Sequence, residues 1–220
     1  QPTSITVGQN QPTAYEYGRH SPAISRAVND HGTRTYDYTD QGYLRQETWD
    51  DAQAAKQYVC THTTSLQGRQ LLRESSDNIT TEHGYDDIGR LHWTTQGNLR
   101  SDFEYNDDGR LKLTKTQDLK TLHRVDCEQV YDSHGQEIDR ILSRYNDQLK
   151  TTEHRISQVW RNDGLLHSRT LYHEGELQLT EFFDYDPRKR LESYWCEGKQ
   201  DAFPRNAKGD PIEEQVFTYD

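Results

Sequence analysis

YDDIGRL at residues 85–91 and YNDDGRL at residues 105–111 are two copies of one motif: an aromatic residue, three further residues, then glycine, arginine and leucine. Degenerate copies occur on both sides, and their glycines or substitutes lie 20 to 29 residues apart. In repeat architectures each copy is a supersecondary unit that buries its apolar face only against its neighbours. The motif therefore predicts a repeat array, and it favours a structural role over catalysis.

The degenerate copies keep different parts of the motif. YTDQGYL at 38–44 keeps tyrosine, glycine and leucine, WRNDGLL at 160–166 has tryptophan in place of tyrosine, and YDPRKRL at 185–191 has lysine in place of glycine. Weaker copies occur at 66–71 and 131–138. The motif positions form the candidate structural site, and they are Tyr38, Gly42, Leu44, Tyr85, Gly89, Arg90, Leu91, Tyr105, Gly109, Arg110, Leu111, Trp160, Gly164, Tyr185, Arg190 and Leu191.

The spacing within the motif predicts a β-hairpin with a three-residue loop. If the three residues after Asp86 form the loop, Asp86 faces Arg90 and Tyr85 faces Leu91, with the two pairs on opposite faces. Gly89 then supplies the positive φ that such a loop requires. Each cross-strand pair contributes about 0.2–1 kcal/mol.

Two further expectations follow from this hairpin. Continued outward in the second copy, the same register places Phe103 opposite Leu113. In the copy at 185–191 the glycine position holds Lys189, which would be strained at positive φ. We therefore expect Pro187 to mark a different type of turn there.

The segments between the motif copies alternate aromatic or β-branched residues with polar ones, as half-buried strands do. Glu174 and Gly175 predict a two-residue hairpin turn. The best helix candidate is residues 50–59, as one or two turns in an insertion, with a loop as the alternative. The pattern as a whole predicts an all-β fold of antiparallel hairpin repeats.

Composition limits the kind of domain that the chain can form. The 220 residues are 30% hydrophobic, but 14 Tyr, 4 Trp and 5 Phe favour an ordered sheet with polar faces over disorder. No composition break separates two halves, so we expect a single repeat array over residues 1–220. The chain contains no methionine and stops at the first two residues of another copy, which leads us to expect a fragment of a longer polypeptide.

Charge and hydropathy argue against two classes of partner. The formal net charge is −11, whereas proteins that bind nucleic acids carry a basic surface. No apolar run is long enough for a membrane span, and no signal peptide begins at Gln1. We expect neither nucleic acid nor a membrane span among the partners of this segment.

Catalytic and metal-binding motifs are missing from the sequence. The ten histidines form no HExxH or HxxxH pair, and no nucleophile elbow or phosphate-binding loop occurs. The residues around Gly109 do not match an EF-hand calcium-binding loop, because Lys115 occupies the position of the bidentate glutamate. Cys60, Cys127 and Cys196 are expected as free, buried or half-buried thiols. We therefore predict no catalytic residue, no cofactor and no metal.

The copies that begin at Tyr85 and Tyr105 resemble the YD repeats of the RHS family. Residues 209–220, GDPIEEQVFTYD, are similar to the repeat core of the C component of bacterial insecticidal toxin complexes. The resemblance implies a strip-like β-sheet that curves and spirals into a hollow shell, which encloses a toxic C-terminal polypeptide until delivery. It also implies a downstream self-cleaving segment, and because this chain shows no copy of it, no catalytic residue carries over.

Three functions remain open from the sequence. The favoured one is a structural segment of an RHS-type shell, exported as part of a bacterial toxin assembly, with other shell-forming segments or toxin-complex subunits and an enclosed toxin polypeptide as partners. The alternative is a cell-surface adhesion or carbohydrate-binding module, since regularly spaced exposed aromatic residues also suit sugars. An enzyme using a carboxylate pair is the third, and it has no motif to support it.

Overall fold

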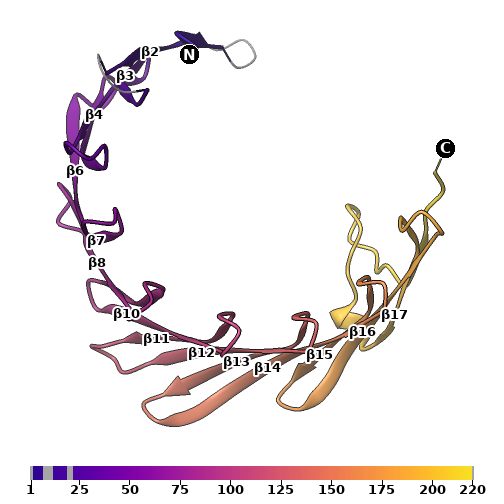
Figure 1. Ribbon diagram of the computed structural model, residues 1–220. Helices are drawn as coiled ribbons and strands as arrows, with labels where there is room; N and C mark the ends of the chain where they lie inside the picture. The colour runs from indigo at the N-terminus through magenta and orange to yellow at the C-terminus, as the bar shows by residue number, and fades with distance from the viewer. Residues whose placement is uncertain (1, 7–11, 19–21, 220) are drawn as a thin grey trace. The chain divides into compact units, whose positions relative to one another are not determined.

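The computed structural model describes residues 2–6, 12–18 and 22–219. These residues form 18 β-strands and one 3-10 helix of three residues, and they divide into two compact units, Gln1–Asn98 and Leu99–Asp220. Each unit is a curved antiparallel sheet, and motif copies lie in both (Figure 1). The predicted all-β fold of antiparallel hairpins is confirmed, whereas the single array over residues 1–220 stays a prediction.

In the first unit every strand pairs antiparallel with the strand that follows it in sequence. Side chains of the longer strands alternate between the two faces of the sheet, as the sequence pattern predicts. The strands are β1 (Ser4–Ile5), β2 (Thr13–Tyr17), β3 (Ile24–Asn29), β4 (Gly32–Tyr38), β5 (Leu44–Asp51), β6 (Lys56–Thr64), β7 (Gln70–Ser75), β8 (Thr80–Tyr85) and β9 (Leu91–Gln96).

The second unit has the same sequential antiparallel pairing. Its elements are β10 (Leu99–Tyr105), β11 (Leu111–Asp118), β12 (Arg124–Tyr131), β13 (Glu137–Asn146), β14 (Leu149–Trp160), β15 (Leu166–His173), β16 (Glu176–Tyr185), β17 (Leu191–Gly198), the 3-10 helix η1 (Gln200–Ala202) and β18 (Glu214–Val216).

Hydrophobic burial is concentrated near the C-terminal end of the second unit. Leu179 on β16 packs with Tyr194 and Cys196 on β17, and Phe203 closes this cluster directly after η1. Elsewhere in the described chain the only buried hydrophobic residue is Cys60. Because most strand residues are half-buried, ladder hydrogen bonds and cross-strand pairs must supply much of the stability.

A β-bulge follows the loop of each motif hairpin. In the second copy Tyr105 pairs with Leu111, but Glu104 pairs with Leu113, so Lys112 is an extra residue. The same shift recurs beside Tyr38, Thr64, Tyr85, Tyr131, Trp160 and Tyr185. The prediction that Phe103 faces Leu113 is therefore wrong, and Phe103 pairs with Thr114. An extra residue leaves the hairpin loop unchanged but moves the register beyond it by one position.

Of the helix and the loop left open for residues 50–59, the helix is wrong, because this segment is a tight hairpin with a short turn between β5 and β6. Asp51 pairs with Lys56, and the Asp51 carboxylate accepts hydrogen bonds from the amides of Gln53 and Ala54 at 2.8 and 2.9 Å. Trp49 on β5 stacks on Tyr58 of β6 with ring centroids 5.3 Å apart. This cross-strand pair stabilises the hairpin more than the weak helical propensity of the segment stabilises a helix.

Two smaller expectations have clear outcomes. Glu174 and Gly175 form the predicted two-residue turn, with φ of 51° and 79°, and His173 pairs with Glu176 across it. All three cysteines are free, and Cys60 and Cys196 are buried.

In the part of the chain that the structure describes, no helix has the length and apolar character needed to cross a membrane.

Candidate functional site

The motif loop has the geometry predicted from its sequence. The amide of Gly89 donates a 2.8 Å hydrogen bond to the carbonyl of Asp86, and the amide of Asp86 donates one of 2.9 Å to the carbonyl of Arg90. Gly89 has φ of 84°, and Tyr85 pairs with Leu91 across the strands. The three-residue loop with a left-handed glycine is thus confirmed for this copy.

The same loop occurs in the other copies. The amides of Gly42, Gly68, Gly109, Gly135 and Gly164 each donate to the carbonyl three residues earlier, at 2.8 to 3.1 Å. The cross-strand pairs Tyr38 with Leu44, Tyr105 with Leu111, Trp160 with Leu166 and Tyr185 with Leu191 follow the motif register. One further loop of this kind, in which the amide of Gly209 donates to the carbonyl of Asn206 at 2.9 Å, lies outside the copies that the sequence motif indicates.

The degenerate copy at 185–191 keeps the same turn, so the expectation of a different turn at Pro187 is wrong. Lys189 has φ of 62°, and its amide donates to the carbonyl of Asp186 at 2.9 Å. Pro187 occupies the position after Asp186, where its fixed φ suits a type I turn. The proline therefore supports the ordinary loop, and Lys189 takes on the left-handed strain that glycine avoids.

The carboxylate of the acidic motif residue accepts hydrogen bonds from residues of its own loop. One carboxylate oxygen of Asp186 accepts hydrogen bonds from the amides of Arg188 and Arg190 at 2.8 and 2.9 Å, and the other accepts one from Arg190 Nε at 2.8 Å. Hydrogen bonds from the Arg190 amide and then the Arg190 side chain lower the pKa of Asp186, against desolvation, which raises it. The equivalent carboxylates of Asp86 and Asp132 also have lowered pKa values.

In several copies the motif aromatic residue is hydrogen-bonded to the copy before it. The hydroxyl of Tyr131 donates to the carbonyl of Leu111 at 2.9 Å, and Leu111 is the residue that pairs with the preceding motif tyrosine, Tyr105. Trp160 repeats the contact one copy later, since its Nε1 donates to the carbonyl of Glu137 at 2.8 Å, and Glu137 pairs with Tyr131. The aromatic side chain therefore reaches from its own copy to the backbone of the preceding one.

Three other copies make the same connection. The hydroxyls of Tyr38, Tyr85 and Tyr219 donate to the carbonyls of Ile24, Gln70 and Leu191 at 2.8, 2.8 and 2.7 Å. These acceptors pair with Tyr17, Thr64 and Tyr185, which occupy the equivalent strand position in the preceding hairpin. Tyr219 thus makes the same connection as the tyrosines of the other copies.

Arginines reinforce these connections from the preceding copy. Arg110 lies over the ring of Tyr131 at 5.8 Å from the centroid, and Arg190 lies over Tyr219 at 4.3 Å. The Arg110 guanidinium also occupies the space next to Gly135, where an added Cβ would lie 2.0 Å from a guanidinium nitrogen. The φ of 81° at Gly135 favours glycine, and an added Cβ would also require the flexible Arg110 side chain to shift.

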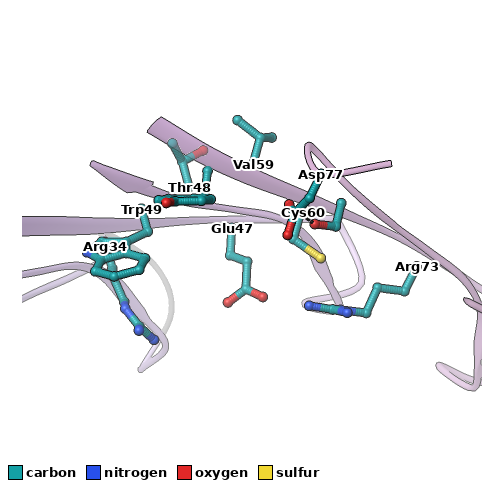
Figure 2. A pocket seen from close by; sticks show the side chains of 10 residues that line it. Arg34, Glu47, Thr48, Trp49, Val59, Cys60, Arg73 and Asp77 are labelled. Atoms are coloured by element: carbon teal, nitrogen blue, oxygen red, sulfur yellow. Dashed lines mark hydrogen bonds between the residues drawn. The ribbon is translucent and has the colours of Figure 1, made fainter. Parts of the chain in front are cut away.

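Side chains with ligand chemistry come together elsewhere, in the first unit. Glu47, Cys60 and His62 bring one potential metal-ligating atom each to within 4.8 Å of the others. Glu47 and Cys60 line a pocket of about 500 Å³ together with Arg34, Trp49 and Arg73 (Figure 2). The pattern Cys-x-His on one strand is the signal that could have identified this cluster, because alternate strand residues share a face.

No protein-family model matches the chain, and no curated protein matches it. A solved structure of a mutant Photorhabdus luminescens Tc holotoxin pore is similar, with a TM-score of 0.64 and 13% identity over 87% of this chain. The chain has the fold of an RHS-type repeat core. The match spans 12% of the holotoxin chain, and at this identity the likeness concerns the fold alone.

A second solved structure is TcdB2-TccC3 without its hypervariable C-terminal region. It matches with a TM-score of 0.38 and 12% identity, over 94% of this chain and 14% of the other. The resemblance to RHS repeats that the motif indicates is confirmed by the holotoxin match at the level of the fold.

Proposed function

We propose that this chain is a stretch of wall in an RHS-type β-shell that encloses a toxin polypeptide before delivery. The observation that carries the proposal is the recurring hydrogen bond from the motif aromatic residue to the backbone of the preceding copy, as in Tyr131 to Leu111. A contact that repeats from copy to copy suits an extended wall, because each added repeat is joined to its neighbour in the same way. The shared fold with a Tc holotoxin segment supports the same role.

In this role the segment itself catalyses no reaction. The polar atoms of the motif are already used in the loop, since the carboxylate of Asp186 accepts three hydrogen bonds from its own turn. A general acid or base needs a titratable group within reach of a substrate proton, and these carboxylates face backbone amides instead. The motif therefore acts as scaffold, and it needs no cofactor.

The partners and location follow from the same proposal. Other shell-forming segments or toxin-complex subunits would continue the sheet, and the toxin polypeptide would lie on the enclosed side. The assembly would be secreted or exported by a bacterium, as a virulence factor active against insects. The motif rings are half-buried and hydrogen-bonded between repeats, so they fit this role better than the alternative of sugar binding.

Cross-linking of the full-length protein that contains this chain tests the proposal. With a lysine-reactive cross-linker and mass spectrometry, we expect links between lysines of the repeats and a polypeptide without repeats. That polypeptide should resist protease in the folded protein and become sensitive after denaturation. The shell would be contradicted if this polypeptide is absent, or if it is sensitive to protease and forms no cross-links to the repeats. Specific binding on a glycan array would instead support the adhesion alternative.

A further inference from the structure

Three side chains with metal-ligating atoms converge on one face of the β5–β6 hairpin. Glu47 on β5 pairs directly with Cys60 on β6. His62 lies two residues further along β6 and therefore projects from the same face as Cys60. A carboxylate oxygen, a thiol sulfur and an imidazole nitrogen are thus brought within 4.8 Å of one another by the strand register alone.

The imidazole of His62 lacks a partner that its burial requires. Its Nε2 atom is buried without a hydrogen-bond partner among the described residues, and only 12% of the side chain is exposed. The nearest carboxylate oxygen, Oε1 of Glu47, lies 3.7 Å away, which is too far for a hydrogen bond. A buried polar atom left in this state costs about 1–3 kcal/mol, so such an atom calls for a ligand.

The 3.7 Å separation suits two ligands of one metal ion. With bonds of about 2.0–2.3 Å, ligand atoms around a tetrahedral Zn²⁺ ion lie about 3.3–3.8 Å apart. Cys60 is 7% exposed, so its sulfur is held in place by the sheet, while the half-exposed Glu47 can adjust. All three atoms lie within 4.8 Å of one another, so an ion between them would require only an adjustment of these side chains.

The surroundings leave one coordination position open to the pocket. Glu47 and Cys60 line the pocket, and Arg73 and Asp77 from the neighbouring part of the sheet line it as well (Figure 2). The guanidinium of Arg73 points toward the Cys60 sulfur in this view (Figure 2). A water molecule or small anion in the fourth position would therefore meet a positive charge.

We propose that Glu47, Cys60 and His62 form a binding site for a divalent transition-metal ion of zinc type, with the fourth position open to the pocket. Mixed sulfur, nitrogen and oxygen ligands suit Zn²⁺ or Co²⁺ and disfavour Mg²⁺ and Ca²⁺, which take oxygen ligands. The ion ties β5 to β6, and its binding free energy adds to the stability of the folded hairpin. This site is independent of the proposed shell function.

Metal titration of the chain tests the site. The chain is purified without metal, and Zn²⁺ binding is measured by calorimetry while Co²⁺ binding is followed by absorption. We expect one ion per chain, with a thiolate-to-cobalt charge-transfer band and the visible bands of tetrahedral cobalt. Zn²⁺ should also protect one of the three thiols from alkylation, and peptide mapping should identify it as Cys60.

Matched variants separate this site from adventitious binding. Cys60→Ser should abolish the charge-transfer band, and His62→Gln and Glu47→Gln should each weaken Zn²⁺ binding at least about 10-fold, the lower limit for lost supporting contacts. Cys127→Ser, a half-buried thiol outside the cluster, should bind like the parent chain.

Glu47→Gln keeps the size of a half-exposed side chain, so its effect remains interpretable if Cys60→Ser fails to fold. Mg²⁺ should produce no binding heat. A chain without the cobalt band, or a band lost in Cys127→Ser and kept in Cys60→Ser, would overturn the proposal.

Discussion

The hydroxyl of Tyr131 on β12 donates a 2.9 Å hydrogen bond to the carbonyl oxygen of Leu111, the first residue of β11. Leu111 itself pairs with Tyr105, the aromatic residue of the preceding copy. One side chain therefore joins two consecutive hairpins through a backbone atom, which is present whatever residue occupies the leucine position. This explains why Gln70 and Glu137 can replace leucine as acceptors in other copies.

Removal of this hydroxyl should weaken the sheet by a small, measurable amount. Tyr131→Phe keeps the ring under Arg110 and deletes only the hydrogen bond, so we expect the free energy of unfolding to fall by about 1 kcal/mol. Urea denaturation measures the change. Tyr145→Phe is the control, because the hydroxyl of Tyr145 has no hydrogen bond to any described residue, and an equal loss in both variants would contradict the link.

Glycine at position 189 should stabilise the chain. Lys189 has φ of 62°, a conformation that costs a non-glycine residue roughly 1–2 kcal/mol. Part of this gain is offset by the greater freedom of glycine in the unfolded chain, so we expect Lys189→Gly to raise the free energy of unfolding by about 1 kcal/mol. Arg188→Gly, at a neighbour without positive φ, should lower it instead, and a loss of stability in Lys189→Gly would show that its conformation is unstrained.

The motif carboxylates should make the fold sensitive to acid. The pKa values of Asp86, Asp132 and Asp186 are lowered in the folded chain, so their contribution is complete above the unfolded value of about 3.9. It is lost as the pH falls through the folded values. We expect the urea midpoint to drop steeply below about pH 4, a change that unfolding at several pH values measures.

An asparagine variant isolates one of these carboxylates. Asn106 closes its loop through the Arg110 amide at 2.8 Å, so an amide oxygen can replace the carboxylate in the turn. Asp186→Asn should therefore fold and show a smaller loss of stability between pH 6 and pH 3 than the parent chain. An identical pH dependence in both proteins would mean that Asp186 does not contribute.

The hairpin loop could be predicted from the sequence because its determinants are local. Gly89 requires a left-handed turn, and that turn alone sets Tyr85 opposite Leu91. The bulge at Lys112 could not be predicted, since one extra residue leaves the composition and the alternation of each strand unchanged. The prediction for Phe103 failed for this reason.

Contacts between different strands could not be predicted from local sequence patterns. The bond from Tyr131 to Leu111 joins residues 20 positions apart, and its acceptor is a backbone atom that no side-chain pattern reveals. The cluster of Glu47, Cys60 and His62 depends on the register of β5 and β6. That register could not be derived while residues 50–59 were expected to form a helix or a loop.

The motif aromatic residues hold successive repeats together, and loss of two of them tests this role most directly. The measurement is urea unfolding of the double variant Tyr85→Ala with Tyr105→Ala, compared with Leu66→Ala at a side chain that is 91% exposed. Truncation of half-buried rings should lower the free energy of unfolding by at least about 2 kcal/mol, whereas Leu66→Ala should change it by less than about 0.5 kcal/mol. An unchanged unfolding midpoint in the double variant would contradict the claim.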